Sequence, residues 1–425
     1  MLQLWLVTNT VLWPFSVKPG GLGLDLNVIV LILTAPIWLW KKPRIARSSA
    51  LLLLFLLLYM AFSIFVAAYS LCSDKFLKSV TTAPILFILV GIGWEIGRRS
   101  QAVDWINLQR AALYSLAAAT GGFAVEMAVP SLFPSQANYR AHGKLSGLFQ
   151  EPSHAAFSLF PCIAILLVAE SKRSRQIGTF ALLGLLLCSR SSTLVALTAA
   201  WLLYRLLARG ITRQAALAAS GIVLLVGLGA AVNFEQYLLP TAERIVGVFA
   251  SDSTDNISSL VYVQGWQDAW ANLVRTHGLG LGFNMMGCQA LPDVPAREVL
   301  ALGGMGELNA EDGSFQFAKI VSEAGVAGIA FYIAIVWWWV RFEKTIRTIK
   351  DCKERCVAST QAALIFCFIA SSFIRGGSYF SGGILLWLVA VAGASKWRQS
   401  RITMSVREAR AYDVGPEPHG AVGCE

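Results

Sequence analysis

The chain has 425 residues, of which 56% are hydrophobic and only 14% are charged, and its mean hydropathy is +0.60. This composition is far more apolar than that of a soluble globular domain and excludes that class. The net charge of +10 lies in short segments between apolar runs, so it indicates membrane topology and attraction to lipid rather than nucleic-acid binding.

Apolar segments follow one another along most of the chain, and several reach the roughly 20 residues that span a hydrocarbon layer. The first segment lacks a basic region and an Ala-x-Ala cleavage site, so we expect a retained span rather than a signal peptide. Because the segments are too long and continuous for barrel strands, we predict an all-α fold, a polytopic membrane bundle of about twelve transmembrane helices. The predicted spans are 2–16, 22–40, 50–71, 79–97, 109–130, 153–170, 177–188, 193–208, 215–232, 315–340, 357–373 and 383–397.

Most of the 35 Lys and Arg residues fall in the segments that follow even-numbered spans. Positive charge stays on the cytoplasmic side of a membrane, so we place both termini in the cytoplasm. We predict one transmembrane domain over residues 1–397, followed by a polar, disordered cytoplasmic tail over 398–425.

A long loop over residues 233–314 precedes the tenth span, on the predicted outer side. Within it, apolar residues at spacings of three and four predict an amphipathic helix over Ser258 to Arg275, with Trp266 and Trp270 one turn apart. Such a helix is suited to the lipid headgroup layer. The following Gly278 to Gly282 lacks the strand-to-helix frame of a dinucleotide site, so we interpret it as a tight turn.

Polar side chains at the membrane edge are costly and are therefore candidates for function. Arg190 lies between two short spans, where it is either a ligand-binding residue or an arginine that reaches toward water from a helix end. Glu151 and His154 open the sixth span three residues apart, on one helix face. They could form an acid–base pair, or they could be a helix cap with an exposed His.

Carboxylates gather just before the tenth span, at Glu307, Glu311 and Asp312. One of them could act as a base, or they could stabilise a helix N-terminus by their negative charge. Lys319 and Glu323 follow one turn apart, and we expect them to pair.

Arginines are frequent on the predicted outer side, and several around one cavity would suit a diphosphate. Each guanidinium group can donate two parallel hydrogen bonds to phosphate oxygens. Each loop arginine alone is more often simply solvated. The eight cysteines are scattered without metal-ligand spacing, so we expect no metal site. The candidates for binding the diphosphate or the glycan are Arg140, Arg190, Arg244, Arg275, Arg375 and Tyr379.

Four motifs, in this order, resemble those of the O-antigen polymerase and O-antigen ligase superfamily, over roughly residues 50–395. Their order and the long loop before the tenth span support the resemblance. The motifs are Gly147-x-Phe149-x-Glu151-Pro152-Ser153, Ser189-Arg190 between two short spans, Trp266 followed by the glycine turn, and Glu323-x-Gly325-Val326-x-Gly328.

The resemblance implies a glycosyltransferase in the bacterial inner membrane that works on the periplasmic face without a metal or other cofactor. It would move a glycan from undecaprenyl pyrophosphate to a sugar hydroxyl, with Arg190 holding the pyrophosphate. Neutralising a leaving diphosphate is the main electrostatic task at an anomeric carbon. The implied partners are undecaprenyl-pyrophosphate-linked oligosaccharide, membrane lipid, a chain-length regulator and a flippase, but no nucleic acid.

The sequence departs from this family at two positions. An Arg usual shortly before the Trp is absent, since Tyr262 and Val263 stand there, and a His usual near the tenth span is replaced by Ser314. That His is the expected base of ligases, so we favour a polymerase and take Asp312 or Glu151 as the base. The alternatives are an O-antigen ligase and a transporter that flips lipid-linked oligosaccharide, although no inverted repeats are evident.

Overall fold

The structure is a computed structural model. The tail over 398–425, Arg244, the ninth predicted span and most of the second lie outside its described residues. The residues it describes are 2–7, 16–17, 24–25, 47–68, 73–141, 143–149, 151–209, 257–287, 293–309, 311–375, 379 and 383–397.

Helices make up almost all of the regular structure in these ranges, and the single strand pairing among them is a two-residue antiparallel contact between β1 (Ser16–Val17) and β2 (Leu24–Asp25). Besides the helix Gly383–Trp397, the longer helices are α1 (Leu2–Val7), α3 (Arg47–Ala68), α4 (Ser73–Arg99), α5 (Ala102–Ala128), α6 (Ala137–Ala141), α7 (Pro152–Leu167), α8 (Lys172–Ser189), α9 (Ser192–Arg209), α11 (Ile257–Arg275), α12 (Pro295–Leu302), α13 (Gln316–Ala324), α14 (Val326–Ile346) and α15 (Cys352–Ile374). Two short 3₁₀ turns, η3 (Pro130–Leu132) and η4 (Pro134–Gln136), precede α6.

A helical membrane protein is therefore confirmed, in the described part of the chain, as the coarse architecture. Four described helices are long and apolar enough to cross a membrane, at Phe76–Arg99, Ala102–Ala128, Val326–Ile346 and Cys352–Ile374. Shorter apolar helices lie at Leu56–Val66, Pro152–Leu167, Ser192–Leu206 and Gly383–Trp397. The total of twelve spans stays a prediction.

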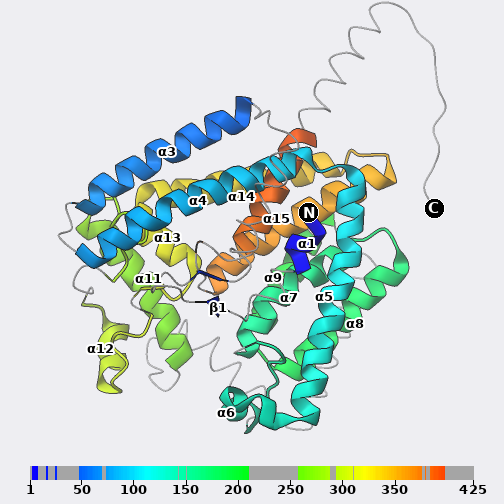
Figure 1. Cartoon of the computed structure of the whole chain (residues 1–425), viewed down its shortest axis with the longest axis horizontal. Helices are drawn as coiled ribbons and strands as arrows, with labels where there is room; N and C mark the ends of the chain where they lie inside the picture. The colour runs from blue at the N-terminus through cyan, green and yellow to red at the C-terminus, as the bar shows by residue number, and fades with distance from the viewer. Residues whose placement is uncertain are drawn as a thin grey trace, which may run out of the picture.

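The helix α15 is the centre of the bundle and packs against α5, α7, α9, α13 and α14 (Figure 1). Ala358, Ala362 and Ala363 are fully buried along it. Small side chains let neighbouring helix backbones approach closely, which is the usual way membrane helices gain packing energy. The helix begins with a cap, since the Asp351 carboxylate accepts a hydrogen bond from the Glu354 N–H at 2.7 Å.

The bundle has two chemically different ends. The connections after α4, α7 and α14 lie at one end, where Gln109 of α5 donates to the Cys356 sulfur of α15 at 3.3 Å. This basic end carries Arg98 and Arg99, and Lys172 and Lys344 belong to it as well. The opposite end, where α7 begins and α15 ends, carries the candidate site. It is the end that the sequence predicts to face the periplasm.

The tenth predicted span, 315–340, is wrong as a single helix, because the chain breaks at Gly325 into α13 and α14. Gly325 has a φ of +59°, and a Cβ there would lie 2.0 Å from the carbonyl oxygen of Gly278. The predicted glycine turn is present and packs closely against the break. Its Leu281 N–H donates to the Ser322 carbonyl at 2.9 Å, which pairs the turn with the end of α13.

The helix α11 exists where the sequence predicts it, but its polar side faces inward. Gln264, Asp268 and Asn272 are at most 2% exposed, whereas Trp270 and Val274 are 69% and 57% exposed. A helix on the surface of a water-soluble protein has the opposite arrangement. The apolar stripe is therefore expected to face lipid.

The buried polar side of α11 has partners on two neighbouring helices, α12 and α13, which lie beside it in Figure 1. The Arg297 guanidinium of α12 donates to Asp268 at 2.5 Å. The Asn272 amide donates to the Ser322 hydroxyl of α13 at 3.2 Å. Polar contacts thus fix α11 to the protein and leave Trp270 and Val274 exposed.

Spin labelling tests this orientation. In lipid nanodiscs, a nitroxide on Trp270→Cys is expected to be relaxed by dissolved oxygen, which concentrates in lipid, more strongly than by a water-soluble nickel chelate. A label on Glu298→Cys of α12, which is exposed, serves as the control and should show the reverse. Stronger relaxation by nickel at both positions would contradict a lipid-facing α11.

Candidate active site

Three of the predicted site residues meet at the end of the bundle opposite the basic end. The Arg375 Nη2 atom lies 2.8 Å from Glu151 Oε2 and 2.8 Å from His154 Nε2. The Ser153 hydroxyl donates to the same Glu151 oxygen at 2.9 Å. We call Glu151, His154 and Arg375 the Arg375 cluster. It joins residues more than two hundred positions apart in the sequence.

Helix ends bring the cluster together. Glu151 precedes α7 with an extended backbone, and Pro152 fills the first helical position, where its missing N–H costs nothing. The first turn of α7 then brings His154 to the same side of the helix as Glu151. Arg375 follows the last residue of α15, and its carbonyl accepts from the Gln316 N–H of α13 at 3.2 Å. Three helix termini therefore converge on one site.

The protonation of the cluster follows from its contacts. A guanidinium can only donate, so His154 Nε2 must accept, and the imidazole is neutral with its proton on Nδ1. Burial raises the pKa of the Glu151 carboxyl, but the Arg375 guanidinium and the other polar neighbours lower it by more, so the pKa lies below its usual range. The cluster is thus one cation held between a carboxylate and a neutral imidazole.

Tyr139 of α6 borders the cluster from another side. Burial raises the pKa of its hydroxyl, the nearby Glu151 carboxylate raises it further, and Arg375 acts in the opposite direction. The hydroxyl is therefore protonated at neutral pH and can donate a hydrogen bond to a bound anion.

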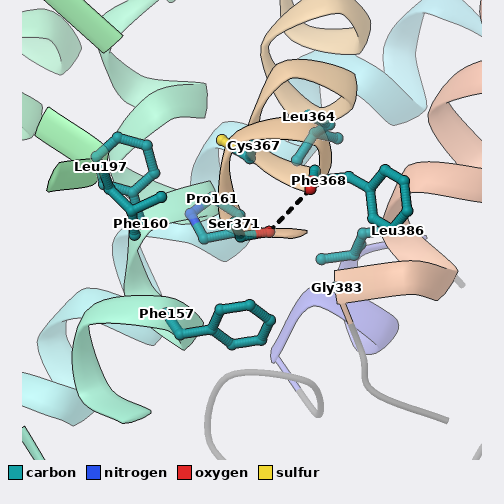
Figure 2. Close-up of a pocket in the computed structure, with 10 residues that line it drawn as sticks. All are labelled: Phe157, Phe160, Pro161, Leu197, Leu364, Cys367, Phe368, Ser371, Gly383 and Leu386. Carbon is teal, nitrogen blue, oxygen red and sulfur yellow. Dashed lines mark hydrogen bonds between the residues drawn. The ribbon is translucent and has the colours of Figure 1, made fainter. Parts of the chain in front are cut away.

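Two small cavities lead from Arg375 into the bundle, and each has room for about one water-sized group. The first has a volume of about 10 Å³ and is lined by Phe157, Gln316, Phe368, Ser371, Ser372, Arg375, Gly383 and Ile384. The second has a volume of about 20 Å³ and is lined by Phe157, Phe160, Pro161, Leu197, Leu364, Cys367, Phe368, Ser371, Gly383 and Leu386 (Figure 2). The cavities share four residues, and Gln316, Ser372 and Arg375 line only the first of them.

Arg190 lies between α8 and α9, as predicted, in a left-handed backbone conformation with a φ of 46°. Its guanidinium packs against Gly143, where a Cβ would lie 2.5 Å from Nη1. The Leu145 N–H donates to the Cys188 carbonyl at 2.9 Å, close to Arg190 in the chain. The loop that contains Gly143 leads on to Glu151, so Arg190 and the Arg375 cluster contact the same loop.

Arg140 holds that loop in place. Its guanidinium donates to the Phe133 carbonyl at 2.8 Å and lies 3.5 Å from the fully buried Glu126 carboxylate. The other Glu126 oxygen accepts from the backbone N–H groups of Ser146 and Gly147 at 2.9 and 2.6 Å. These contacts describe a structural support for the loop.

Arg275 is also occupied by a local contact, because it donates to Asn272 on the same helix at 2.8 Å. Arg244 lies outside the described residues. Of the predicted arginines that the structure describes, Arg375 alone lines the cavities. These two cavities are therefore lined by one arginine, and a cavity surrounded by several arginines stays a prediction.

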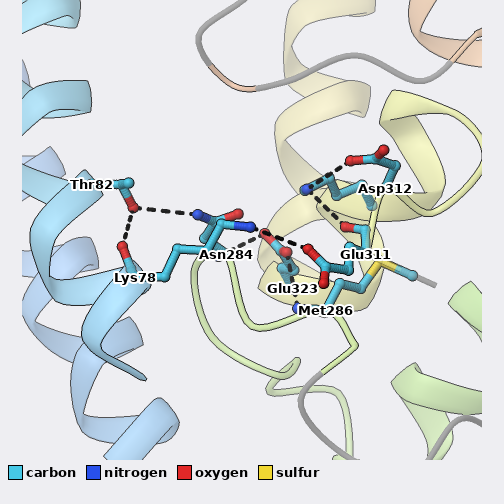
Figure 3. Close-up of polar contacts among 8 residues, drawn as sticks. Lys78, Thr82, Asn284, Met286, Glu311, Asp312 and Glu323 are labelled. Carbon is cyan, nitrogen blue, oxygen red and sulfur yellow. Dashed lines mark hydrogen bonds and ion pairs between the residues drawn. The ribbon is translucent and has the colours of Figure 1, made fainter. Parts of the chain in front are cut away.

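A second polar network anchors α13 (Figure 3). Glu323 is 1% exposed and accepts from the N–H groups of Asn284 and Met286 at 2.9 and 3.2 Å. The Tyr379 hydroxyl also donates to it, at 2.5 Å. Asn284 in turn donates to the Thr82 hydroxyl of α4 at 3.3 Å. Glu323 therefore joins the glycine-turn segment to α13, and Tyr379 belongs to this network.

The expected direct pair between Lys319 and Glu323 is wrong. The Lys319 ammonium instead donates to the Glu311 carbonyl at 2.9 Å and lies 3.9 Å from the Asp312 carboxylate. The Asp312 side chain is 69% exposed. The Lys78 ammonium of α4 pairs with Glu311 at 3.2 Å. Asp312 therefore lies with the anchoring lysines, and none of its described contacts joins it to the Arg375 cluster.

Gln316 is the site residue that sequence reasoning missed. It is 4% exposed, lines the polar cavity beside Arg375, and has no hydrogen-bond partner for either amide atom in the described part of the chain. The sequence predicts an apolar span over 315–340, and Gln316 is its second residue. A polar amide at this position could have been recognised as a candidate for function.

Compared with protein-family models and with curated proteins, the chain matches none of them.

Proposed function

We propose that the protein is a polysaccharide polymerase of the bacterial inner membrane. It would join undecaprenyl-pyrophosphate-linked repeat units into O-antigen, capsule or exopolysaccharide on the periplasmic face. The observation that carries the proposal is the Arg375 cluster, a cation between a carboxylate and a neutral imidazole at the end of a membrane bundle. The motif resemblance supports the same assignment.

The reaction needs an anion-binding group and a base. An acceptor hydroxyl attacks the anomeric carbon, the new carbon–oxygen bond forms, and the bond from that carbon to the diphosphate breaks. Undecaprenyl diphosphate leaves with the bonding electrons, and the base takes the hydroxyl proton. Arg375 would bind the leaving diphosphate, since guanidinium groups match phosphate oxygens. Arg190, across the loop, would support the same anion.

Glu151 is the base in this proposal. While Arg375 contacts Glu151, the guanidinium keeps the pKa of the carboxyl low and makes the carboxylate a weak base. When the guanidinium turns to the diphosphate, Glu151 loses that contact and becomes a stronger base. Glu151 is preferred to Asp312 because it already contacts Arg375, whereas Asp312 contacts Lys319.

The test is to incubate the purified protein with undecaprenyl-pyrophosphate-linked repeat units and resolve the products on a gel. A ladder spaced by one repeat unit is expected from the unaltered protein and from Arg275→Gln. From Arg375→Gln the rate should fall by about 10²–10³-fold, the usual effect of removing one donor that stabilises the transition state.

Other outcomes would replace the proposal. Transfer of finished glycan to lipid A-core without a ladder would identify a ligase. Movement of the lipid-linked substrate across liposome membranes only in the presence of the protein, without new glycosidic bonds, would identify a flippase.

A further inference from the structure

The exposed face of α14 changes from apolar to basic along its length. Four of its large apolar side chains are 58%, 65%, 54% and 39% exposed, namely Val326, Ile333, Trp337 and Val340. Residues three, four or seven positions apart share one helix face, and this spacing continues into Arg341, Lys344 and Arg347. These three are exposed as well. One face of α14 is therefore suited to hydrocarbon over most of its length and to anions at its end.

A ring contact holds the first of these cations at the boundary between the two parts. The guanidinium carbon of Arg341 lies 3.7 Å from the centre of the Trp337 ring. The negative face of the ring attracts the cation, and tryptophan side chains prefer the depth of the lipid headgroups. A guanidinium held over a ring still has N–H groups at its edge that can donate to phosphate oxygens.

The acidic side chain among these residues points away from the exposed face. Glu343 is 4% exposed and accepts a hydrogen bond from the Tyr204 hydroxyl of α9. The next carboxylate along the chain, that of Asp351, caps α15. Within the described ranges, no ion pair includes Arg341 or Lys344. Their positive charge therefore acts outward, toward the surrounding lipid.

We propose that this face of α14 binds one anionic diacyl phospholipid in the leaflet at the basic end of the bundle. The lipid phosphate accepts from Arg341 and Lys344, and Arg347 adds to the positive potential. The acyl chains lie along Ile333 and Val340. The inference goes beyond the proposed function and does not rest on it, since the Arg375 cluster lies at the opposite end.

The test is native mass spectrometry of the purified full chain in detergent, titrated with phosphatidylglycerol or with phosphatidylcholine of the same acyl chains. The unaltered protein is expected to bind the first phosphatidylglycerol about tenfold or more tightly. In Arg341→Gln/Lys344→Gln the preference should fall to about threefold or less, because each basic side chain near anionic lipid contributes roughly a factor of five.

Two matched variants separate this site from the general charge of the basic end. Lys172→Gln/Arg173→Gln of α8 also removes two exposed cations, but these follow the exposed Glu170, so the preference should stay. Trp337→Leu keeps every cation and removes the ring. It should weaken phosphatidylglycerol binding by about two- to fivefold, the usual strength of a cation–ring contact.

Three results would overturn the inference. They are equal binding of both lipids by the unaltered protein, an unchanged preference in Arg341→Gln/Lys344→Gln, and the same loss in both double variants. A chain that elutes as a dimer in gel filtration, and as a monomer after Trp337→Leu, would place a second copy on this face instead of lipid.

Discussion

Replacing Glu151 by Gln is expected to lower the polymerisation rate of the purified protein by about 10²–10⁴-fold, the usual contribution of a general base. The amide keeps the shape of the side chain and can still accept from Ser153, but it cannot take up the acceptor's proton. Asp312→Asn is the matched control. Its carboxylate is exposed and close to Lys319, so the rate should stay near that of the unaltered protein.

The measurement is the initial rate of ladder formation at saturating lipid-linked donor, with donor affinity determined separately. If Glu151 were only a support for Arg375, its replacement would weaken donor binding and leave the rate at saturation nearly unchanged. A rate that collapses in Asp312→Asn and survives in Glu151→Gln would transfer the base to Asp312.

Gly325→Ala is expected to destabilise the protein by about 3 kcal/mol, combining the strain of a positive φ with overpacking. Gly325 has a φ of +59°, and its Cβ would lie 2.0 Å from a backbone oxygen. The junction between α13 and α14 would have to open, and with it the glycine-turn contacts. Thermal unfolding in detergent, followed by the loss of a folded peak in gel filtration, measures the effect.

Substitutions at two other glycines separate the effect of backbone strain from the effect of overpacking. Gly304 has a φ of +71° but open space around it, so Gly304→Ala reports the backbone strain without the clash. Gly121 is helical with open space, so Gly121→Ala should be neutral or slightly stabilising. If all three variants unfolded at the same temperature, the close backbone contact at Gly325 would contribute nothing.

The helices could be predicted because they depend on the length and composition of each segment, which the sequence shows directly. Length and apolar composition alone placed α7 within a few residues of its observed bounds, and they located α5 and α15, although both helices begin earlier than predicted. The break at Gly325 could not be predicted from the pattern of the surrounding residues alone. It depends on a backbone contact with the distant glycine turn.

The site was predictable only in part, for the same reason. The three-residue spacing of Glu151 and His154 showed that they share a helix face. No periodicity could show that Arg375, which follows a different helix, completes the cluster. Arg140 and Arg375 have the same side chain, and only the fold shows that Arg140 lies against the buried Glu126 carboxylate. Gln316 was hidden by the apolar residues around it.

The reversed polarity of α11 has a practical consequence for work on the loop. If the segment from α11 to α12 were excised and produced in water, Trp270 and Val274 would be left without lipid, and Asn272 would lose Ser322 of α13. Such a fragment should aggregate, although most of the residues between the flanking spans look like an extramembrane domain. Antibodies or binders against this region should therefore be raised against the whole protein in a bilayer.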